Sequence, residues 1–234
     1  MQSPILVLVP GLLCDKTVWQ PVIDKFEDRW PIVVGDCSTQ DSITQMSADI
    51  LDSADGDLYV AGHSMGARVA LEMARMQPER VKKLVLADTG THPRKPGEDI
   101  KRQEMVALAF GQGMRALAEK WLPPMVHPDR QADNDLMTRL TDMVLRMSAP
   151  LHARQINALL HRPDATLYLP DIACETLLIV GRQDAWSPVA QHEAMLPALQ
   201  TARLKVIEDA GHFAPIEQPE EFVATIGEWL GEAD

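Results

Sequence analysis

Short apolar runs alternate along this chain with longer segments of helical periodicity, and this alternation limits the possible fold more than any other feature. The apolar runs predict strands at residues 5–9, 32–34, 58–61, 84–87, 177–180 and 204–207. Helices are predicted at residues 18–26, 43–53, 65–76, 189–199 and 220–230. Strands that are apolar on both faces are typical of a parallel sheet covered by helices on each side. The predicted class is therefore α/β, with a predominantly parallel sheet flanked by helices.

The alternation breaks once, between Gly90 and Glu175, where helical segments are separated by prolines and no strong strand appears. A structureless loop of this length is rare in a compact domain. We therefore predict that residues 91–175 form a helical cap, inserted into a core made of residues 1–90 and 176–234.

Charge and cysteine content exclude several function classes. The net charge of -12, without long runs of like charge, opposes binding to nucleic acid or to an anionic membrane. Cys14, Cys37 and Cys174 are widely spaced and form no CxxC pair, so neither a disulfide framework nor a zinc site is predicted. The first apolar run is too short for a signal peptide or a membrane span. We expect a cytoplasmic protein that needs no metal or cofactor and acts on a small molecule, as a monomer or a dimer.

Residues 62–66, GHSMG, place Ser64 between two glycines where a predicted strand meets a predicted helix. A serine presented on such a tight turn needs small residues two positions before and after it, which is the pattern of a nucleophile elbow. A serine that only caps the helix is the alternative, and the motif alone does not separate the two. In the helix that follows, Arg68, Glu72 and Arg75 share one polar face while the rest is apolar.

A nucleophilic serine needs a base, and the base needs an acid that orients it. His212 is the predicted base because it lies in EDAGHFAPIEQP, between the last strand and the last helix, at the sheet edge where ligands bind in open α/β folds. Asp184, in LLIVGRQDAWSP, follows the preceding strand at the same edge and is the predicted acid. Asp88, at the end of LVLAD, is the second choice.

The oxyanion formed when a carbonyl is attacked needs two hydrogen-bond donors. We expect these to be the backbone N–H groups of Met65, at the start of the helix, and of Leu12, in the loop after the first strand. Side chains expected near the substrate pocket are Leu13, His63, Trp121, Trp186 and Phe213.

Four segments carry a resemblance that covers nearly the whole chain: LVLVPGLLCDKTVW, YVAGHSMGARVALEMA, LLIVGRQDAWSP and EDAGHFAPIEQPEEF. Together, with serine, aspartate and histidine in that order, they resemble the α/β hydrolase superfamily, in particular its lid-bearing serine esterases and lactonases. The resemblance implies a six-stranded sheet in the order 2-1-3-4-5-6.

The leading prediction is hydrolysis of an ester, thioester or lactone of a small to medium, largely apolar acid through an acyl-enzyme. The superfamily also implies carbon–carbon bond hydrolysis of a dienoic diketone, cofactor-free perhydrolysis or acyl transfer on the same triad. Carbon–carbon hydrolysis would need cationic groups for a substrate carboxylate, and the cap offers Arg102, Arg115, Arg146, Arg154 and Arg162. A small-molecule receptor of the same fold is the non-enzymatic alternative.

Overall fold

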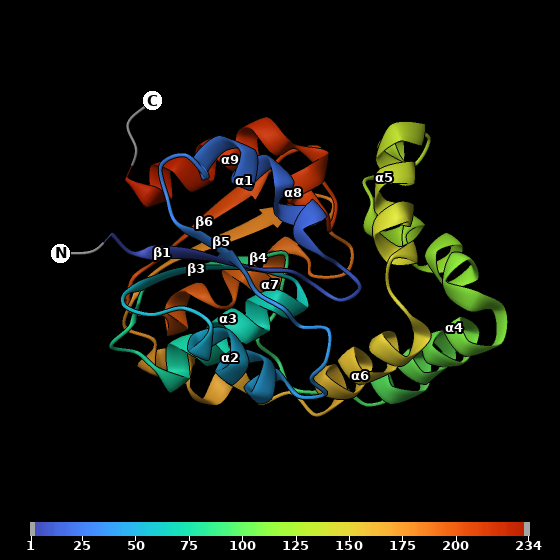
Figure 1. Ribbon diagram of the computed structural model, residues 1–234, viewed down its shortest axis with the longest axis horizontal. Helices are drawn as coiled ribbons and strands as arrows, with labels where there is room; N and C mark the ends of the chain where they lie inside the picture. The colour runs from blue at the N-terminus through green and yellow to red at the C-terminus, as the bar shows by residue number, and fades with distance from the viewer. Residues whose placement is uncertain (1–2, 232–234) are drawn as a thin grey trace.

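A six-stranded parallel sheet in the order β2-β1-β3-β4-β5-β6 forms the centre of the computed structural model, which describes residues 3–231 (Figure 1). Both the parallel class and the strand order predicted from the sequence are confirmed. The strands are β1 (Ile5–Val9), β2 (Ile32–Val34), β3 (Leu58–His63), β4 (Val81–Ala87), β5 (Glu175–Gly181) and β6 (Ala202–Ile207).

The four central strands are almost entirely buried, as continuous apolar runs require, whereas the edge strands β2 and β6 are partly exposed. Strand β4 begins three residues before the predicted start, because charged residues join it at its amino end. There the ammonium of Lys83 lies over the rings of Tyr59 and Trp229, 5.5 and 5.9 Å from their centroids, and donates to the Trp229 carbonyl, 2.6 Å away.

Helices cover both faces of the sheet (Figure 1). On one face lie α1 (Gln20–Phe26), α8 (Ala214–Glu217) and α9 (Pro219–Leu230), and on the other lie α2 (Ile43–Asp52) and α3 (Met65–Met76). Helix α7 (Val189–Glu193) ends six residues before the predicted end, because Pro197 cannot continue an α-helix and only a short 3-10 turn follows. The 3-10 helices are η1 (Lys16–Trp19), η2 (Pro123–Met125), η3 (Pro128–Arg130), η4 (Ala165–Leu167), η5 (Leu169–Asp171) and η6 (Leu196–Ala198).

Three further helices, α4 (Glu98–Trp121), α5 (Asn134–Leu145) and α6 (Ala149–Leu160), occupy the chain between β4 and β5 and lie beyond the carboxyl ends of the strands (Figure 1). They are the cap helices. Gly113, with φ of 86°, interrupts α4 and lets it bend. Helix α6 is fastened to the core by Gln155, which accepts from the N–H of Leu13 at 2.9 Å and donates to the carbonyl of Cys37 at 3.0 Å. In the described part of the chain no helix is long and apolar enough to cross a membrane.

Candidate active site

Ser64 stands at the junction of β3 and α3 with a backbone φ of 55° and ψ of -115°, a strained combination for a residue with a side chain. Two hydrogen bonds hold it there: its N–H donates to the carbonyl of Ala87 at 2.8 Å, and its own carbonyl accepts from the hydroxyl of Thr89 at 2.9 Å. The side chain of Ser64 makes no capping bond to the helix. The structure thus favours a presented hydroxyl over the cap that the motif alone allowed.

The two glycines of the motif are required by close backbone contacts. A Cβ on Gly62 would overlap the backbone of Gly66 and Ala67. A Cβ on Gly66 would overlap the carbonyl groups of Val9, the last residue of β1, and of Pro10, the residue that follows it. The absence of a side chain at Gly62 therefore permits the tight turn from β3 into α3, and its absence at Gly66 permits the close approach of the elbow to the end of β1.

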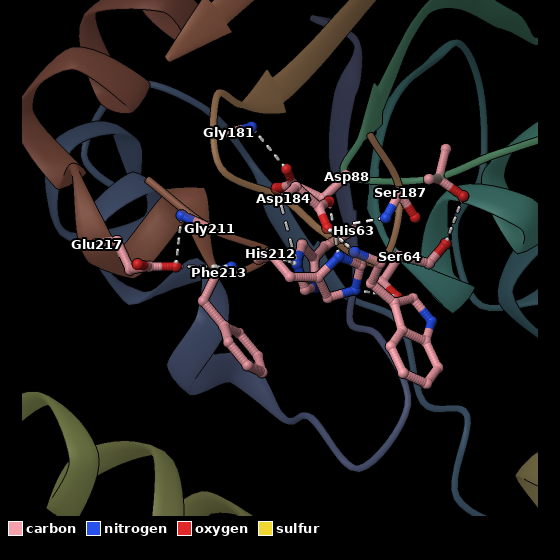
Figure 2. A network of polar contacts seen from close by, with 12 residues as sticks. His63, Ser64, Asp88, Gly181, Asp184, Ser187, Gly211, His212, Phe213 and Glu217 are labelled. Atoms are coloured by element: carbon pink, nitrogen blue, oxygen red, sulfur yellow. Dashed lines mark hydrogen bonds and ion pairs between the residues drawn. The ribbon is translucent and has the colours of Figure 1, made fainter. Parts of the chain in front are cut away.

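The imidazole of His212 lies between Ser64 and Asp184, with Nε2 2.8 Å from Ser64 Oγ and Nδ1 2.8 Å from Asp184 Oδ2 (Figure 2). An ionised carboxylate can only accept, so Nδ1 carries the proton and donates it to Asp184. Nε2 is then free to accept the hydrogen bond of the Ser64 hydroxyl. Both His212 and Asp184 are 2% exposed, so this line of groups is shielded from water.

Asp184 is favoured as an anion by its surroundings. Burial opposes ionisation of this carboxyl, but His212 favours it. The backbone N–H groups of Ser187 and Trp186 also favour it, because each donates to Oδ1 at 2.8 Å. Together these groups outweigh burial and hold the pKa of Asp184 below its ordinary value. Asp88, the second choice from the sequence, makes no hydrogen bond to the His212 ring in the described chain, and its Oδ2 lies 3.9 Å from Nε2 of His63. It accepts from the N–H of Gly181 at 2.9 Å, and burial together with the nearby Asp184 raises the pKa of its carboxyl well above the usual range.

His63 is the last residue of β3, directly before Ser64, and its ring contacts the backbone of His212 (Figure 2). Its Nε2 is 2.7 Å from the carbonyl oxygen of His212, to which it donates, and its ring stacks on Phe213 with centroids 5.7 Å apart. Burial and the neighbouring His212 lower the pKa of His63 to about 3, so the ring is neutral. It supports the backbone of His212 as an uncharged donor.

A buried glutamate that the sequence analysis missed holds the loop of His212. Glu217 accepts from the N–H groups of Gly211 at 3.1 Å and Phe213 at 3.0 Å, on either side of the histidine (Figure 2). It also accepts from the backbone N–H of His127 at 2.8 Å. The N–H of His212 itself donates to the carbonyl of Met125 at 2.7 Å. The only trace in the sequence is a glutamate five residues after His212, which is indistinguishable there from the surface glutamates that follow.

The backbone N–H groups predicted to hold an oxyanion belong to Leu12 and Met65, and both residues line a cavity together with Ser64. The cavity has a volume of about 390 Å³ and lies between the core and the cap helices α4 and α6. Trp121 and Trp186 line it as well. Trp186 is 50% exposed, which places it at the opening.

Three other expected pocket residues lie elsewhere, and this corrects the sequence analysis. Leu13, in the loop that follows β1, is fully buried, and its N–H donates to Gln155. His63 and Phe213 stack on each other, and neither lines the cavity. Adjacent residues on a turn project in different directions, so nearness to Ser64 or His212 in sequence did not bring these side chains into the cavity.

Of the cap arginines, Arg102 and Arg162 line the cavity, whereas Arg115 is exposed, Arg146 pairs with Asp15 at 2.8 Å and Arg154 donates to the carbonyl of Ser38. Arg68, assigned from the sequence to the polar face of its helix, also lines the cavity, because the cap covers that face.

Within residues 3–231 no three His, Cys, Asp or Glu side chains gather in a group that could hold a metal ion.

Comparison with known proteins identifies the family and its similar structures. A model described as the Alpha/beta hydrolase family matches residues 6–225. Over 237 aligned positions the chain is 27% identical to the pimeloyl-[acyl-carrier protein] methyl ester esterase of Nitrosomonas europaea, covering 95% of this chain and 94% of that protein. It is also 27% identical to the 2-hydroxymuconate semialdehyde hydrolase of a Pseudomonas species, in an alignment that covers 80% of this chain and 65% of that protein. A malate-bound thermophilic esterase from Thermogutta terrifontis superposes with a TM-score of 0.89 at 27% identity, covering 98% and 90%.

Proposed function

This chain belongs to the alpha/beta hydrolase family and is a hydrolase, and from that premise we propose that it cleaves a carboxylic ester, thioester or lactone through an acyl-enzyme on Ser64. The observation that carries the proposal is the position of His212, 2.8 Å from both Ser64 Oγ and Asp184 Oδ2. An unperturbed serine hydroxyl is a weak nucleophile, and this arrangement supplies the base that it needs.

In the first half-reaction, Ser64 Oγ attacks the carbonyl carbon while Nε2 of His212 takes the hydroxyl proton. Asp184 stabilises the imidazolium that forms and keeps its ring oriented. The developing oxyanion accepts hydrogen bonds from the N–H groups of Leu12 and Met65. His212 then returns the proton to the leaving oxygen or sulfur, which departs as an alcohol or thiol.

In the second half-reaction, water attacks the acyl group on Ser64 and gives its proton to His212. The tetrahedral intermediate collapses, the free acid leaves, and the proton returns to Ser64 Oγ. Support for esters in particular comes from two relatives, which are named as esterases. The apolar part of the cavity wall, formed by residues such as Met105, Met125 and Ile156, is suited to an acyl chain.

A second candidate is hydrolysis of a carbon–carbon bond on the same three residues. It is favoured by the basic side chains in the cavity wall and by the similarity to the 2-hydroxymuconate semialdehyde hydrolase. An ester panel alone does not separate the candidates, so a vinylogous diketone is assayed beside the esters.

The proposal is tested with p-nitrophenyl esters of short acids, comparing the wild type with Ser64→Ala. We expect the substitution to lower kcat by at least about a thousandfold. A fluorophosphonate probe followed by mass spectrometry is expected to label Ser64. Labelling of Ser187 instead, which is the other serine among the described cavity residues, or turnover equal in both proteins, would overturn the assignment.

A further inference from the structure

The cavity wall is strongly basic in a chain that is otherwise acidic. Five cationic side chains line it, namely Arg68, Lys95, Lys101, Arg102 and Arg162, whereas Glu98 is the one carboxylate among the described lining residues. The whole chain carries a net charge of -12, so a cluster of basic side chains around one cavity is not expected from its composition. Lys95 and Lys101 are exposed, whereas the side chains of Arg102 and Arg162 are 14% and 1% exposed and Arg68 is partly buried. A positive charge removed from water in this way is unfavourable unless an anion accompanies it.

Glu98 is already occupied. It binds the guanidinium of Arg162 through both carboxylate oxygens, at 2.9 and 2.8 Å, and accepts from Nε of Arg102 at 2.8 Å. Burial opposes its ionisation, but the hydrogen bonds from Arg162, the Lys95 N–H and Arg102 together lower the pKa of Glu98 to about 2. One carboxylate is thus shared by two guanidinium groups.

Arg162 has no donor left for a ligand. Besides Glu98, it donates to the carbonyl groups of Leu159, His92 and Pro93, and its side chain is 1% exposed. Its role is to fasten the end of α6 to the segment before α4.

Arg68 and Arg102 are in the opposite situation. Within residues 3–231 no carboxylate pairs with Arg68, whose only hydrogen bond is to the carbonyl of His92 at 3.1 Å. Burial, reinforced by Arg162 and Arg102, lowers its pKa to about 9. Arg102 uses only Nε, which leaves its two terminal nitrogens available, and its side chain is 14% exposed. Two half-buried guanidinium groups therefore face the cavity with unused donors.

His152 adds a polar group to the same wall. It is 1% exposed, and its Nδ1 has no hydrogen-bond partner within the described chain. An unsatisfied buried polar atom lowers stability unless a ligand or water completes it. The same lining contains the apolar side chains of Met105, Met125 and Ile156, so the cavity is amphipathic.

We infer that Arg68 and Arg102 bind a free carboxylate of the substrate, so that this hydrolase cleaves esters, thioesters or lactones that carry a carboxylate in addition to the attacked carbonyl. The inference rests on the proposed reaction at Ser64. Arginine suits this role because its planar donors match the two carboxylate oxygens. Arg68 lies four residues after Ser64 on α3, about 6 Å along the helix axis, so the same helix positions the nucleophile and the anion site.

The test compares two methyl esters of equal chain length, monomethyl adipate and methyl hexanoate, which differ in the terminal carboxylate. We expect the wild type to prefer monomethyl adipate in kcat/KM, and Arg68→Gln and Arg102→Gln each to lower that preference by about tenfold or more. Arg68→Lys should retain more of the preference than Arg68→Gln, because it keeps the charge. Arg115→Gln, on the exposed side of α4, is the matched control and should leave the preference unchanged.

A second pair places the carboxylate in the alcohol, using the acetate ester of hydroxyhexanoic acid beside hexyl acetate. The inference is supported if the wild type prefers the anionic ester of either pair and both arginine variants reduce that preference. The pair that shows the preference then tells whether the carboxylate belongs to the acyl part or to the alcohol part of the substrate. Absence of preference in both pairs, or a preference that neither arginine variant reduces, overturns it. Because Arg68 and Arg102 lie on different helices, one variant remains informative if the other does not fold.

Failure of the proposed reaction gives a different result. In that case neither member of a pair is hydrolysed faster by the wild type than by Ser64→Ala. Adipate binding to Ser64→Ala, measured by calorimetry against hexanediol, then still reports on the anion site without any turnover. No adipate binding to that variant, or adipate binding that Arg68→Gln and Arg102→Gln in the same background leave unchanged, would overturn the anion site.

Discussion

The carboxylate of Glu217 accepts a hydrogen bond of 2.8 Å from the backbone N–H of His127. It also accepts from the N–H groups of Gly211 and Phe213, which flank His212. A single side chain, 2% exposed, therefore joins the loop of His212 to the segment that follows α4. The loop that carries His212 is therefore held by that segment in addition to the sheet.

Glu217→Gln is expected to lower both stability and kcat. The amide offers one acceptor oxygen in place of two, so at least one buried N–H loses its partner, which costs about 1 to 3 kcal/mol. Urea denaturation measures the free energy of unfolding, and p-nitrophenyl ester hydrolysis measures kcat. Glu221→Gln is the matched control, because Glu221 is 40% exposed in its pair with Lys205 and should change stability by less than about 1 kcal/mol. Equal stability of the two variants would contradict the role given to Glu217.

Asp184 and Asp88 are both buried acids, and substitution by asparagine should separate them. Asp184→Asn removes the acceptor that fixes the His212 tautomer, and we expect kcat/KM to fall by about ten thousandfold. Asp88 contacts the Gly181 N–H instead, and its raised pKa favours a neutral carboxyl that an amide resembles. Asp88→Asn should therefore lower kcat/KM by less than about tenfold. Similar losses in the two variants would mean that Asp88 shares the role of Asp184.

His192 links acidity to stability. Its Nε2 accepts from the N–H of Thr89 at 3.1 Å, and burial lowers its pKa to about 4 in the folded protein. Since the unfolded value is higher, the unfolded chain binds more protons between these values. This contribution to stability is present above about pH 6.5 and is lost as the pH falls toward 4.

Accordingly, the free energy of unfolding should fall between pH 7 and pH 5 by about 2 kcal/mol more in the wild type than in His192→Gln. Glutamine can still accept from Thr89 but does not titrate. Denaturation curves at the two pH values measure the difference. Parallel losses in the two proteins would show that His192 is not the titrating group.

The glycines of the elbow should not tolerate alanine. A methyl group on Gly62 or Gly66 would meet backbone atoms that cannot move without shifting β3 or the β1 loop. We expect either variant to lose more than about 3 kcal/mol of stability, together with its activity. Gly111→Ala, on α4 with open space around the new Cβ, is the control and should be neutral or stabilising by about 1 kcal/mol.

The strands were predictable because both of their faces are buried. A strand of this kind is a continuous apolar run, such as residues 5–9, whereas an amphipathic helix or strand is interrupted by polar residues. The proximity of Ser64, Asp184 and His212 was predictable for a related reason, since each follows a parallel strand and all such ends meet at one edge. What the sequence did not contain is the contact between the cap and the core. The division into residues 1–90, 91–175 and 176–234 stays a prediction.

Arg68 illustrates this limit. Periodicity assigns it to the polar side of α3, which in an isolated α/β layer would face solvent. The cap helices cover that side, and a surface arginine becomes part of a cavity wall. Glu217 was missed for the same reason, because its partner His127 lies ninety residues away in sequence. Neither the position of Arg68 in the cavity wall nor the contact of Glu217 with His127 produces a local pattern in the sequence.

The order of the strands along the chain also has a consequence for biosynthesis. Ser64 precedes His212 by 148 residues, and the strands that carry Asp184 and His212 are the last two to be made. A nascent chain emerging from the ribosome therefore exposes its serine long before the groups that would activate it exist. During refolding, esterase activity should likewise return only after β5 and β6 have docked. The rate at which activity returns therefore measures the last step of folding.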